Sequence, residues 1–512
     1  MTLHLTNARI PGERGLLGNL INISIDNGVV SALDFIGQTT SVTLPSATRA
    51  ARVVQGDDQV IDLDGRWIMP GLWDSHVHMG QWAQARRRLD LSHTTSVDAV
   101  LERVSQRADS ADPALVGFGW RPAEISGQTS LESLDAVTGG KPTYLFSVDM
   151  HSVWLNSAGF AAQGVTATES GVVSERACFE IATRVSDIDD ETLDAWIDEA
   201  AREAARRGVV GITDFEMAPN SAAWRRRISR GADTLRVEAA VYPEFLDIAV
   251  EAGMRTGDTV ASTGGLLRVG PLKIILDGSL GSQTARCFEP YPGATGPAAR
   301  GVLNLPLPEL VSLMGRAWAA GIAPAVHAIG DEAVDMALDA FEMVQCAGTI
   351  EHAQLVRAED VSRFAQLKVL ASVQPRHLVD DRTAAERLWP GRTGQAFAFR
   401  QMRDAGVAMR FGSDAPAAAL DPWQAIVAAV TRTAPGGEAW NPQECLSVDE
   451  AIQCSVRSHV AVGQPADFAV LDIDPLEVDD LSSLPLDLAT TPVSATFVGG
   501  RVTHSLLEKG SS

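Results

Sequence analysis

Two histidines separated by one residue end an apolar stretch near the beginning of the chain. The run Gly71–Ser75 leads directly into His76-Val77-His78. Side chains two residues apart on a β-strand point to the same side, so both imidazoles would aim at one point just beyond the strand. Neutral imidazole is the commonest metal-binding side chain. Taken by itself, the HxH sequence is equally consistent with two unrelated loop histidines, and two ligands make a poor metal site.

Four further ionisable side chains occur in or directly after later apolar runs. They are Lys273 in Leu267–Leu276, His327 at the end of Ile322–His327, His352 at the end of Thr349–His352, and Asp414 just after Val407–Gly412. Imidazole and carboxylate groups are ligands for Zn²⁺ and other divalent metals. In isolation, Asp414 would be interpreted as a turn residue of Gly-Ser-Asp-Ala-Pro. If these runs are neighbouring strands, six candidate side chains converge on one site.

Eight apolar runs through the middle of the chain provide those strands. The predicted strands are Gly71–His78, Val209–Phe215, Leu235–Tyr242, Leu267–Leu276, Ile322–His327, Thr349–His352, Val369–Gln374 and Val407–Gly412. Helices are predicted at Leu193–Arg207, Leu307–Ala320, Glu332–Cys346, Ala358–Gln366 and Ala396–Ala405. Eight strands with intervening helices indicate an α/β fold, a (β/α)8 TIM barrel over residues 69–459. Catalytic groups of this fold lie at the carboxyl ends of the strands, where the six candidates fall.

Residues 80–206 separate the first two predicted strands and are too many for one crossover. They contain strand-like runs of their own at Leu115–Gly119 and Thr143–Val148. We interpret this region as an insertion after barrel strand one that folds over the barrel mouth and faces the substrate.

The sequences at the two ends of the chain predict β-strands and hairpin turns. Strands are predicted at Leu3–Ile10, Leu20–Asp26, Val29–Phe35 and Val60–Asp64, with Asn27-Gly28 as a hairpin turn. Ala466–Asp472 and Val493–Val502 are predicted strands near the other end, with Gly499-Gly500 as a turn. We expect residues 1–68 and 460–512 to form one small β-sandwich; two separate small domains are the alternative.

Composition limits the partners and the setting of the protein. The formal net charge of −23 over 512 residues argues against a nucleic-acid footprint and against attraction to an anionic membrane. The five cysteines form no CxxC pair, which indicates reduced thiols. The first residues lack the features of a signal peptide, and no apolar run is long enough for a membrane span. We expect a soluble cytoplasmic protein that acts on a small molecule; its oligomeric state stays open, a homo-oligomer included.

The motifs together resemble the amidohydrolase superfamily, and within it the amidohydrolase-3 branch of YtcJ-like proteins. The resemblance extends over nearly the whole chain. It rests on Ile68–His78, Asp277–Ser282, His327–Asp331, Ile350–His352, Gly412–Pro416 and Ala466–Phe468. The family pattern implies that metal ligands are His76, His78, His327, His352 and Asp414.

Lys273 lies on the strand whose lysine is carboxylated in the binuclear members of the superfamily. An ammonium would be repelled by a divalent cation, whereas a carbamate is anionic and bridges two metals. The resemblance therefore implies that Lys273 is a further metal ligand. The alternatives are a mononuclear site and an unmodified lysine that extends its amine to solvent or pairs with a carboxylate.

The expected activity follows from a bound divalent cation. Zn²⁺ is the metal we expect, and Fe, Mn and Ni are alternatives with the same ligands. The site would hold one or two ions. Such a cation lowers the pKa of water from about 16 toward about 7, so that hydroxide attacks a carbonyl or imine-like carbon. Asp414 would transfer the water proton to the leaving group, and the metal, together with His327 or His352, would polarise the oxygen of the substrate. We predict hydrolysis of a C–N bond in an amide, N-acyl compound, formamide or cyclic amide. The alternatives are an esterase or deaminase with the same centre, and an inactive barrel that serves as a binding or assembly protein.

Four residues outside the ligand set are candidates for contact with the substrate: Trp120, His151, Arg286 and His377. Trp120 and Arg121 could offer an aromatic wall and a cation, or could form a structural stack. The segment Asp149–His151 resembles a family segment near the substrate, or contributes to the structure of the insertion. The sequence does not identify the substrate.

Overall fold

The protein is described from a computed structural model. The structure describes residues 2–12, 20–36, 41–43, 59–91, 94–120, 125–147, 152–174, 176–186, 188–434, 437–477 and 493–507. The chain divides into two compact units, one formed by Met1–Met79 with Ala200–Ser512 and the other by Gly80–Glu199. Among the described residues, no helix combines the length and apolarity needed to cross a bilayer.

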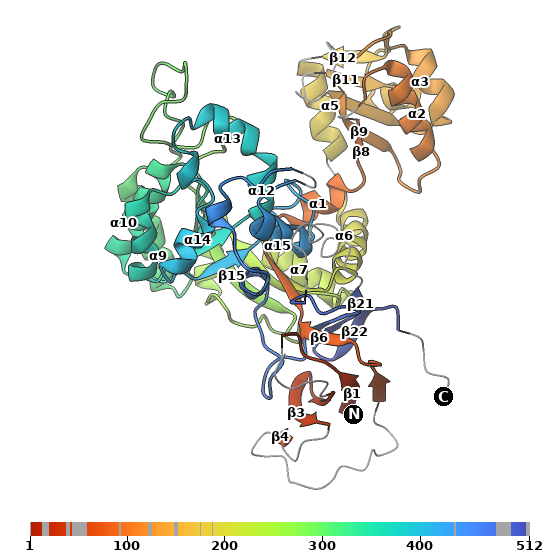
Figure 1. Cartoon of the computed structure of the whole chain (residues 1–512). Coiled ribbons are helices and arrows are strands. Elements are labelled where there is room, and N and C mark those ends of the chain that lie inside the picture. Colours follow the sequence, from red (N-terminus) through yellow and green to blue (C-terminus); the bar gives the residue numbers. More distant parts are fainter. Residues whose placement is uncertain are drawn as a thin grey trace. The chain divides into compact units, whose positions relative to one another are not determined.

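The larger unit contains the predicted (β/α)8 barrel (Figure 1). Its eight strands pair in parallel in chain order, with the first and last at the two ends of the sheet. The strands are β7 (Leu72–Val77), β13 (Val209–Asp214), β14 (Arg236–Val241), β15 (Leu267–Ile275), β16 (Pro324–Ala328), β17 (Thr349–His352), β18 (Leu370–Val373) and β19 (Met409–Phe411). All eight strands were predicted from the sequence. Strands of a parallel sheet are buried on both faces and therefore appear as continuous apolar runs.

Helices follow most of these strands and cover the barrel. They are α6 (Asp190–Ala205), α7 (Asn220–Ser229), α8 (Leu246–Glu251), α9 (Leu307–Ala319), α10 (Asp331–Val344), α11 (Ala358–Leu367), α12 (Pro375–Asp380), α13 (Arg382–Leu388), α14 (Phe399–Asp404), α15 (Pro422–Thr431) and α16 (Val448–Cys454). The helix predicted from Ala396 begins only at Phe399. Phe397 has φ 53° and donates its N–H to Gln354, and this left-handed residue interrupts the helical pattern.

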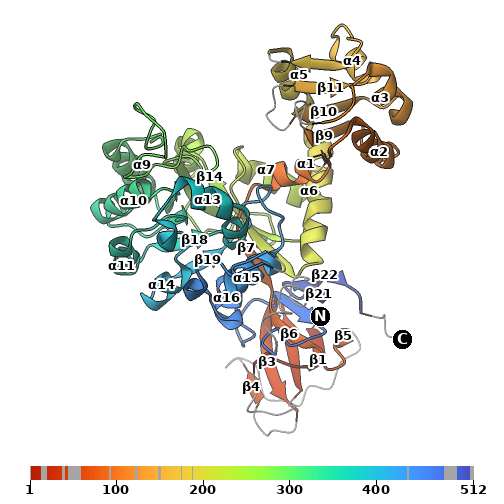
Figure 2. The ribbon, with the colours of Figure 1, turned by 45° about the horizontal axis from the view of Figure 1, so that its top comes forward.

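The chain ends form the expected composite sandwich (Figure 2). One sheet contains β1 (Thr2–Ala8), β2 (Ile21–Asp26), β3 (Val29–Phe35), β4 (Ser41–Thr43) and β5 (Gln59–Asp62). The other joins β6 (Trp67–Pro70) to β20 (Phe468–Leu471), β21 (Val493–Val498) and β22 (Arg501–Ser505). Leu5 and Ile23 of the first sheet share a buried core with Phe468 and Phe497 of the second. The C-terminal strands therefore complete the hydrophobic core of the N-terminal sheet.

The inserted unit has a sheet of its own, in the order β12-β11-β10-β9-β8. Its strands are β8 (Leu89–Asp90), β9 (Leu115–Trp120), β10 (Thr143–Ser147), β11 (Ser152–Leu155) and β12 (Val172–Ser174). The helices are α2 (Val97–Arg107), α3 (Leu131–Thr138), α4 (Ser157–Gln163) and α5 (Arg176–Ser186), and α1 (Met79–Ala85) leads into the unit. Leu145 and Trp154 belong to a buried cluster made within this unit. The insertion is thus a small domain with its own core.

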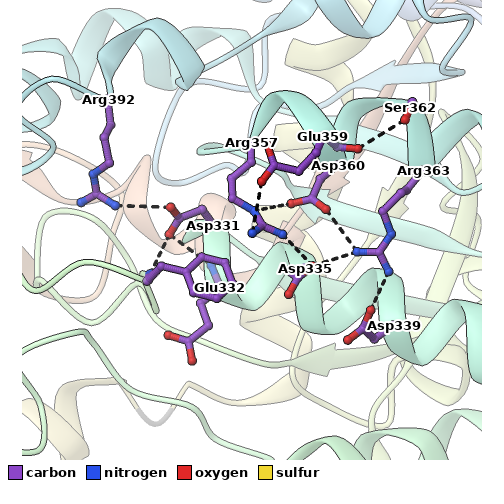
Figure 3. A network of polar contacts seen from close by, with 11 residues as sticks. Asp331, Glu332, Asp335, Asp339, Arg357, Glu359, Asp360, Ser362, Arg363 and Arg392 are labelled. Carbon is purple, nitrogen blue, oxygen red and sulfur yellow. Dashed lines mark hydrogen bonds and ion pairs between the residues drawn. The ribbon is translucent and has the colours of Figure 1, made fainter.

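An ion-pair network joins α10 to α11 on the outside of the barrel (Figure 3). At its centre lies Asp360, which is 1% exposed and accepts hydrogen bonds from Arg357 Nε at 2.7 Å and Arg363 Nη1 at 3.1 Å. Both arginines also donate to Asp335 Oδ1 on α10, at 2.7 and 2.8 Å. Charge-assisted hydrogen bonds that share partners in this way order both helices.

Asp360→Ala should lower the free energy of the urea unfolding transition by about 2 kcal/mol, because two arginines lose their buried partner. Glu386→Ala is the control, since Glu386 pairs with Arg382 in an exposed i,i+4 contact. That change should cost about 0.5 kcal/mol or less. Equal losses in the two variants would contradict a stabilising role for the network.

Candidate metal centre

Strand β7 and the turn after β19 bring three of the predicted ligands together. Asp414 Oδ1 lies 3.4 Å from His78 Nε2 and 3.6 Å from His76 Nε2. His76, His78 and Asp414 each offer a ligand atom, and these atoms lie within 4.8 Å of one another. The alternation of a strand places the two imidazoles on one side, as the HxH spacing predicts.

The backbone around Asp414 holds it against the first strand. The Asp414 N–H donates to the His76 carbonyl at 2.7 Å, and the His78 N–H donates to the Ala415 carbonyl at 2.8 Å. Asp414 has φ 56°, a left-handed conformation that an aspartate tolerates better than most residues. A Cβ on Gly412 would lie 2.6 Å from His76 Cβ, so only glycine permits this close approach.

A second group of potential ligand atoms is formed by His352, His377 and Asp414, again within 4.8 Å of one another. The His352 and His377 rings stack at 6.2 Å with an interplanar angle of 12°. His377 Nε2 lies 4.0 Å from Asp414 Oδ2, so the two oxygens of this carboxylate face different histidines. The sequence predicted His377 as a substrate contact; the structure brings it to the ligand cluster.

His327 packs beside this group without joining either set of three. Its ring centroid is 4.3 Å from that of His352. Its Nε2 lies 3.2 Å from the Gly278 carbonyl and 3.4 Å from Asp277 Oδ1. Because a carbonyl oxygen only accepts, Nε2 carries the proton and the lone pair lies on Nδ1.

Lys273 also reaches the predicted site. Its side chain is buried, and Nζ lies 3.1 Å from His76 Nε2 and 4.5 Å from the centroid of the Phe215 ring. Burial lowers the pKa of the Lys273 amine to about 8. The amine therefore lies beside the same imidazole nitrogen that faces Asp414.

Glu351 fixes the orientation of His76, and the sequence did not predict this role. His76 Nδ1 lies 2.7 Å from Glu351 Oε2, and both side chains are almost completely buried. A carboxylate accepts, so Nδ1 carries the proton and Nε2 presents its lone pair to the site. A signal was available, because a glutamate inside the apolar strand Thr349–His352 needs a buried partner.

Burial keeps three of the histidines neutral, His76, His327 and His352, and neutral imidazole is the state that binds a metal. Burial lowers the pKa of His76 and of His352, and that of His327 to about 3. Burial also opposes the charge of Asp414, but the hydrogen bond from His78 and the neighbouring histidines hold its pKa well below the usual range. Neutral imidazoles around an ionised carboxylate are a suitable donor set for a divalent cation.

Unsatisfied polar atoms give a second indication that the residues fit a metal. Within the described part of the chain, His78 Nδ1, His352 Nδ1 and His377 Nε2 are buried without a hydrogen-bond partner. Buried polar atoms in native proteins almost always have partners. A cation bound here would satisfy at least one of these nitrogens.

Two buried aspartates position the loops that carry the ligands. Asp74 Oδ1 accepts from the His76 N–H at 3.1 Å and from the Ser413 N–H at 2.9 Å. Asp277 accepts from the N–H groups of Arg286, Ile329 and Gly330 at 2.9 to 3.0 Å. Burial raises the pKa of each carboxyl to about 7. Neither role was predicted, since their partners are backbone amides that no motif spacing identifies.

The other predicted substrate contacts have these positions. Arg286 forms a bidentate pair with Glu332, through Nε at 2.8 Å and Nη2 at 3.1 Å. Trp120 belongs to the inserted unit, is 2% exposed, and donates its indole N–H to the Leu145 carbonyl at 2.8 Å. Its indole is therefore fully used within the fold of that unit. His151 lies outside the described residues.

A (β/α)8 barrel with histidines and an aspartate gathered at the carboxyl ends of its strands defines the class of metal-dependent hydrolases. The chain belongs to the amidohydrolase family, whose amidohydrolase-3 model matches residues 59–504. The resemblance noted in the sequence is thereby confirmed.

Known proteins resemble the chain over most of its length. The putative amidohydrolase YtcJ of Bacillus subtilis is 26% identical, with 88% of this chain and 91% of that protein covered. The N-substituted formamide deformylase of Arthrobacter pascens is 25% identical over 89% of this chain and 94% of that enzyme. A solved structure of an uncharacterised metal-dependent hydrolase from Pyrococcus furiosus matches with a TM-score of 0.74 at 27% identity, covering 93% and 100% of the two chains.

Glu351→Gln should weaken metal binding about 10- to 100-fold, because His76 loses the carboxylate that fixes its orientation. The measurement is a chelator-competition titration with the metal content determined by elemental analysis. Glu342→Gln, an exposed change on α10, is the control and should bind as the wild type does. Unchanged affinity in Glu351→Gln would contradict the positioning role.

Proposed function

We propose that the protein is a metal-dependent hydrolase that cleaves a C–N bond of a small molecule, such as an N-acyl compound, a formamide or a cyclic amide. The observation that carries the proposal is the double use of Asp414, whose two oxygens face the His76–His78 pair and His377. One carboxylate between two groups of histidines can hold a cation and remain next to the reacting water.

The residues that would hold the cation are the predicted ligands His76, His78, His327, His352 and Asp414. His377 is a further candidate ligand, because it forms a group of potential ligand atoms with His352 and Asp414. Imidazole and carboxylate donors favour Zn²⁺. When bound, a divalent cation supplies two effects: it acidifies water, and it polarises a carbonyl oxygen.

Asp414 is the proposed proton carrier. Its carboxylate is ionised, since the surrounding histidines hold its pKa well below the usual range despite burial. It would accept a proton from the attacking water and deliver it to the leaving nitrogen. His327 and His352 stay neutral in this environment. The N–H of His327 faces the Gly278 carbonyl, so His327 would hold the cation through Nδ1, and His352 would orient the carbonyl oxygen of the substrate.

Lys273 is proposed to be carboxylated in the active enzyme. As an ammonium 3.1 Å from His76 Nε2, it would repel a cation held by that nitrogen. Attack of the neutral amine on CO₂ forms an N–C bond and releases one proton, which leaves an anionic carbamate. The carbamate would place oxygen donors beside His76 and allow two cations instead of one.

Preference for a C–N bond is supported by the similarity to the N-substituted formamide deformylase. An esterase or a deaminase would need the same donors, so the substrate panel has to include these bonds. An inactive barrel is disfavoured, because the described residues retain all six predicted ligand side chains in or beside one cluster.

The double variant His76→Ala/His78→Ala should lose the bound metal and at least about 1000-fold in kcat/KM, because two donors of the site are removed. Metal content is measured by elemental analysis. Activity is measured on N-acyl amino acids, N-substituted formamides, cyclic amides, esters and aminopyrimidines. The matched control is His459→Ala, an exposed histidine that lies outside both groups of ligand atoms. Undiminished metal in the double variant, or turnover of esters or aminopyrimidines in place of amides, would contradict the proposal.

Growth and purification with ¹³C-bicarbonate should give a carbamate signal in the ¹³C NMR spectrum of the wild type. Lys273→Gln should lack the signal and hold fewer metal ions per chain, because it cannot form the anionic donor. Lys368→Gln, which changes the residue directly after α11, is the control and should keep the signal. Equal spectra and metal content in wild type and Lys273→Gln would rule out the carbamate.

A further inference from the structure

A basic cavity lies at the end of the barrel opposite the candidate metal centre. It has a volume of about 610 Å³ and lies entirely within the larger unit. Its walls include the starts of β13 and β14 at Val210 and Arg236, whereas the metal-ligand candidates lie at the carboxyl ends of the strands. The tips of two sandwich hairpins close one side, where Gly28 and Gly499 approach each other.

Five arginines and two carboxylates account for all the charged residues that line the cavity. The arginines are Arg236, Arg268, Arg410, Arg457 and Arg501, and the carboxylates are Glu238 and Asp467. The whole chain has a formal net charge of −23, so this excess of positive charge is local. A concave surface lined by one sign of charge concentrates counter-ions of the other sign.

Three of the arginines are matched by carboxylates of the protein. Arg236 forms a bidentate pair with Asp467, through Nε at 2.6 Å and Nη2 at 2.9 Å. Arg457 pairs with Glu238 and also donates to Thr213 Oγ1 at 2.8 Å. Arg501 pairs with Asp233 at 3.2 Å. Two of these pairs, Arg236–Asp467 and Arg501–Asp233, join the sandwich to the barrel.

The other two arginines of the cavity, Arg268 and Arg410, differ from these three. Within the described part of the chain, neither of them forms a hydrogen bond or ion pair through its guanidinium. Arg410 is only partly exposed, and burial together with the charge of Arg457 lowers its pKa to about 10, although the carboxylates of Glu238 and Glu351 act in the opposite direction. The Nε of Arg457 is itself buried without a partner among the described residues. Glu238 pairs with Arg457 and also attracts Arg410, so one carboxylate serves two neighbouring guanidiniums and positive charge remains in excess.

We propose that this cavity binds a small oxyanion with two or more charges, a phosphate ester or a polycarboxylate, held by Arg268 and Arg410. Guanidinium groups donate in a planar fork that matches both phosphate and carboxylate oxygens. The volume is in the range of small-molecule sites. The site would be distinct from the metal centre, since its residues line the other end of the barrel and share no member with the ligand cluster.

Isothermal titration of the full chain, stripped of metal by a chelator and kept at physiological salt, tests this site. Pyrophosphate and citrate serve as the probes. We expect one equivalent of at least one probe to bind the wild type, and the tighter probe identifies the phosphate or the carboxylate class. Arg268→Gln and Arg410→Gln should each weaken binding about tenfold or more. Arg382→Gln, which removes an exposed arginine of α13, is the control and should leave the affinity unchanged.

The absence of binding by either probe would overturn the proposal, as would equal affinity in the wild type and in both arginine variants. Arg268 is exposed, so Arg268→Gln decides the outcome if Arg410→Gln fails to fold. Binding lost in His76→Ala/His78→Ala would assign the anion to the metal centre and overturn the second site. The result does not depend on the proposed hydrolysis, because the titration measures no turnover.

Discussion

Closure of the barrel between its first and last strands is the constraint on which the candidate site depends. The eight-stranded sheet ends at β7 and β19, and its two ends meet through the Asp414 N–H to His76 carbonyl bond and the His78 N–H to Ala415 carbonyl bond. The same residues supply three potential ligands. Gly412 allows this contact, since any side chain there would collide with His76. Backbone hydrogen bonds therefore fix the positions of the residues that carry the donors. A backbone held in this way moves less than a free side chain does.

Buried carboxylates extend this control to the rest of the barrel mouth. Asp74 ties β7 to the turn that contains Asp414, and Asp277 gathers the amides of the loop after β16. Glu351 directs His76 from the far side of the ring. Each of these groups is costly to bury, and each is compensated by the hydrogen bonds that it accepts. Groups that touch no substrate thus determine where the donors point.

The sequence predicted the fold and most of the cluster because the eight barrel strands are apolar runs and because metal-binding side chains are few and recognisable. His76, His78, His352 and Asp414 could be placed by strand period and strand order. Glu351 and the two aspartates act through partners distant in sequence, which spacing does not identify. His377 follows β18 on the short helix α12, so its approach to Asp414 depends on how that helix begins.

The inserted unit was harder to predict in detail, since its sheet combines short strands from residues that show no regular alternation. β8 has two residues and β12 has three, both below the length at which a pattern can be detected. Two of its strands were still predicted, at Leu115 and Thr143, where the apolar runs are longest.

The composite sandwich has a consequence for the order in which the chain is made. Ile68 pairs with Val470, and the first sheet shares its core with Phe468 and Phe497. During synthesis, the N-terminal strands leave the ribosome long before the segments that cover them. Their apolar face stays exposed while the barrel and the insertion are translated, and such surfaces favour aggregation or chaperone binding. Synthesis of strands β20 and β21, rather than emergence of the barrel, is then the step that allows the core of the sandwich to form.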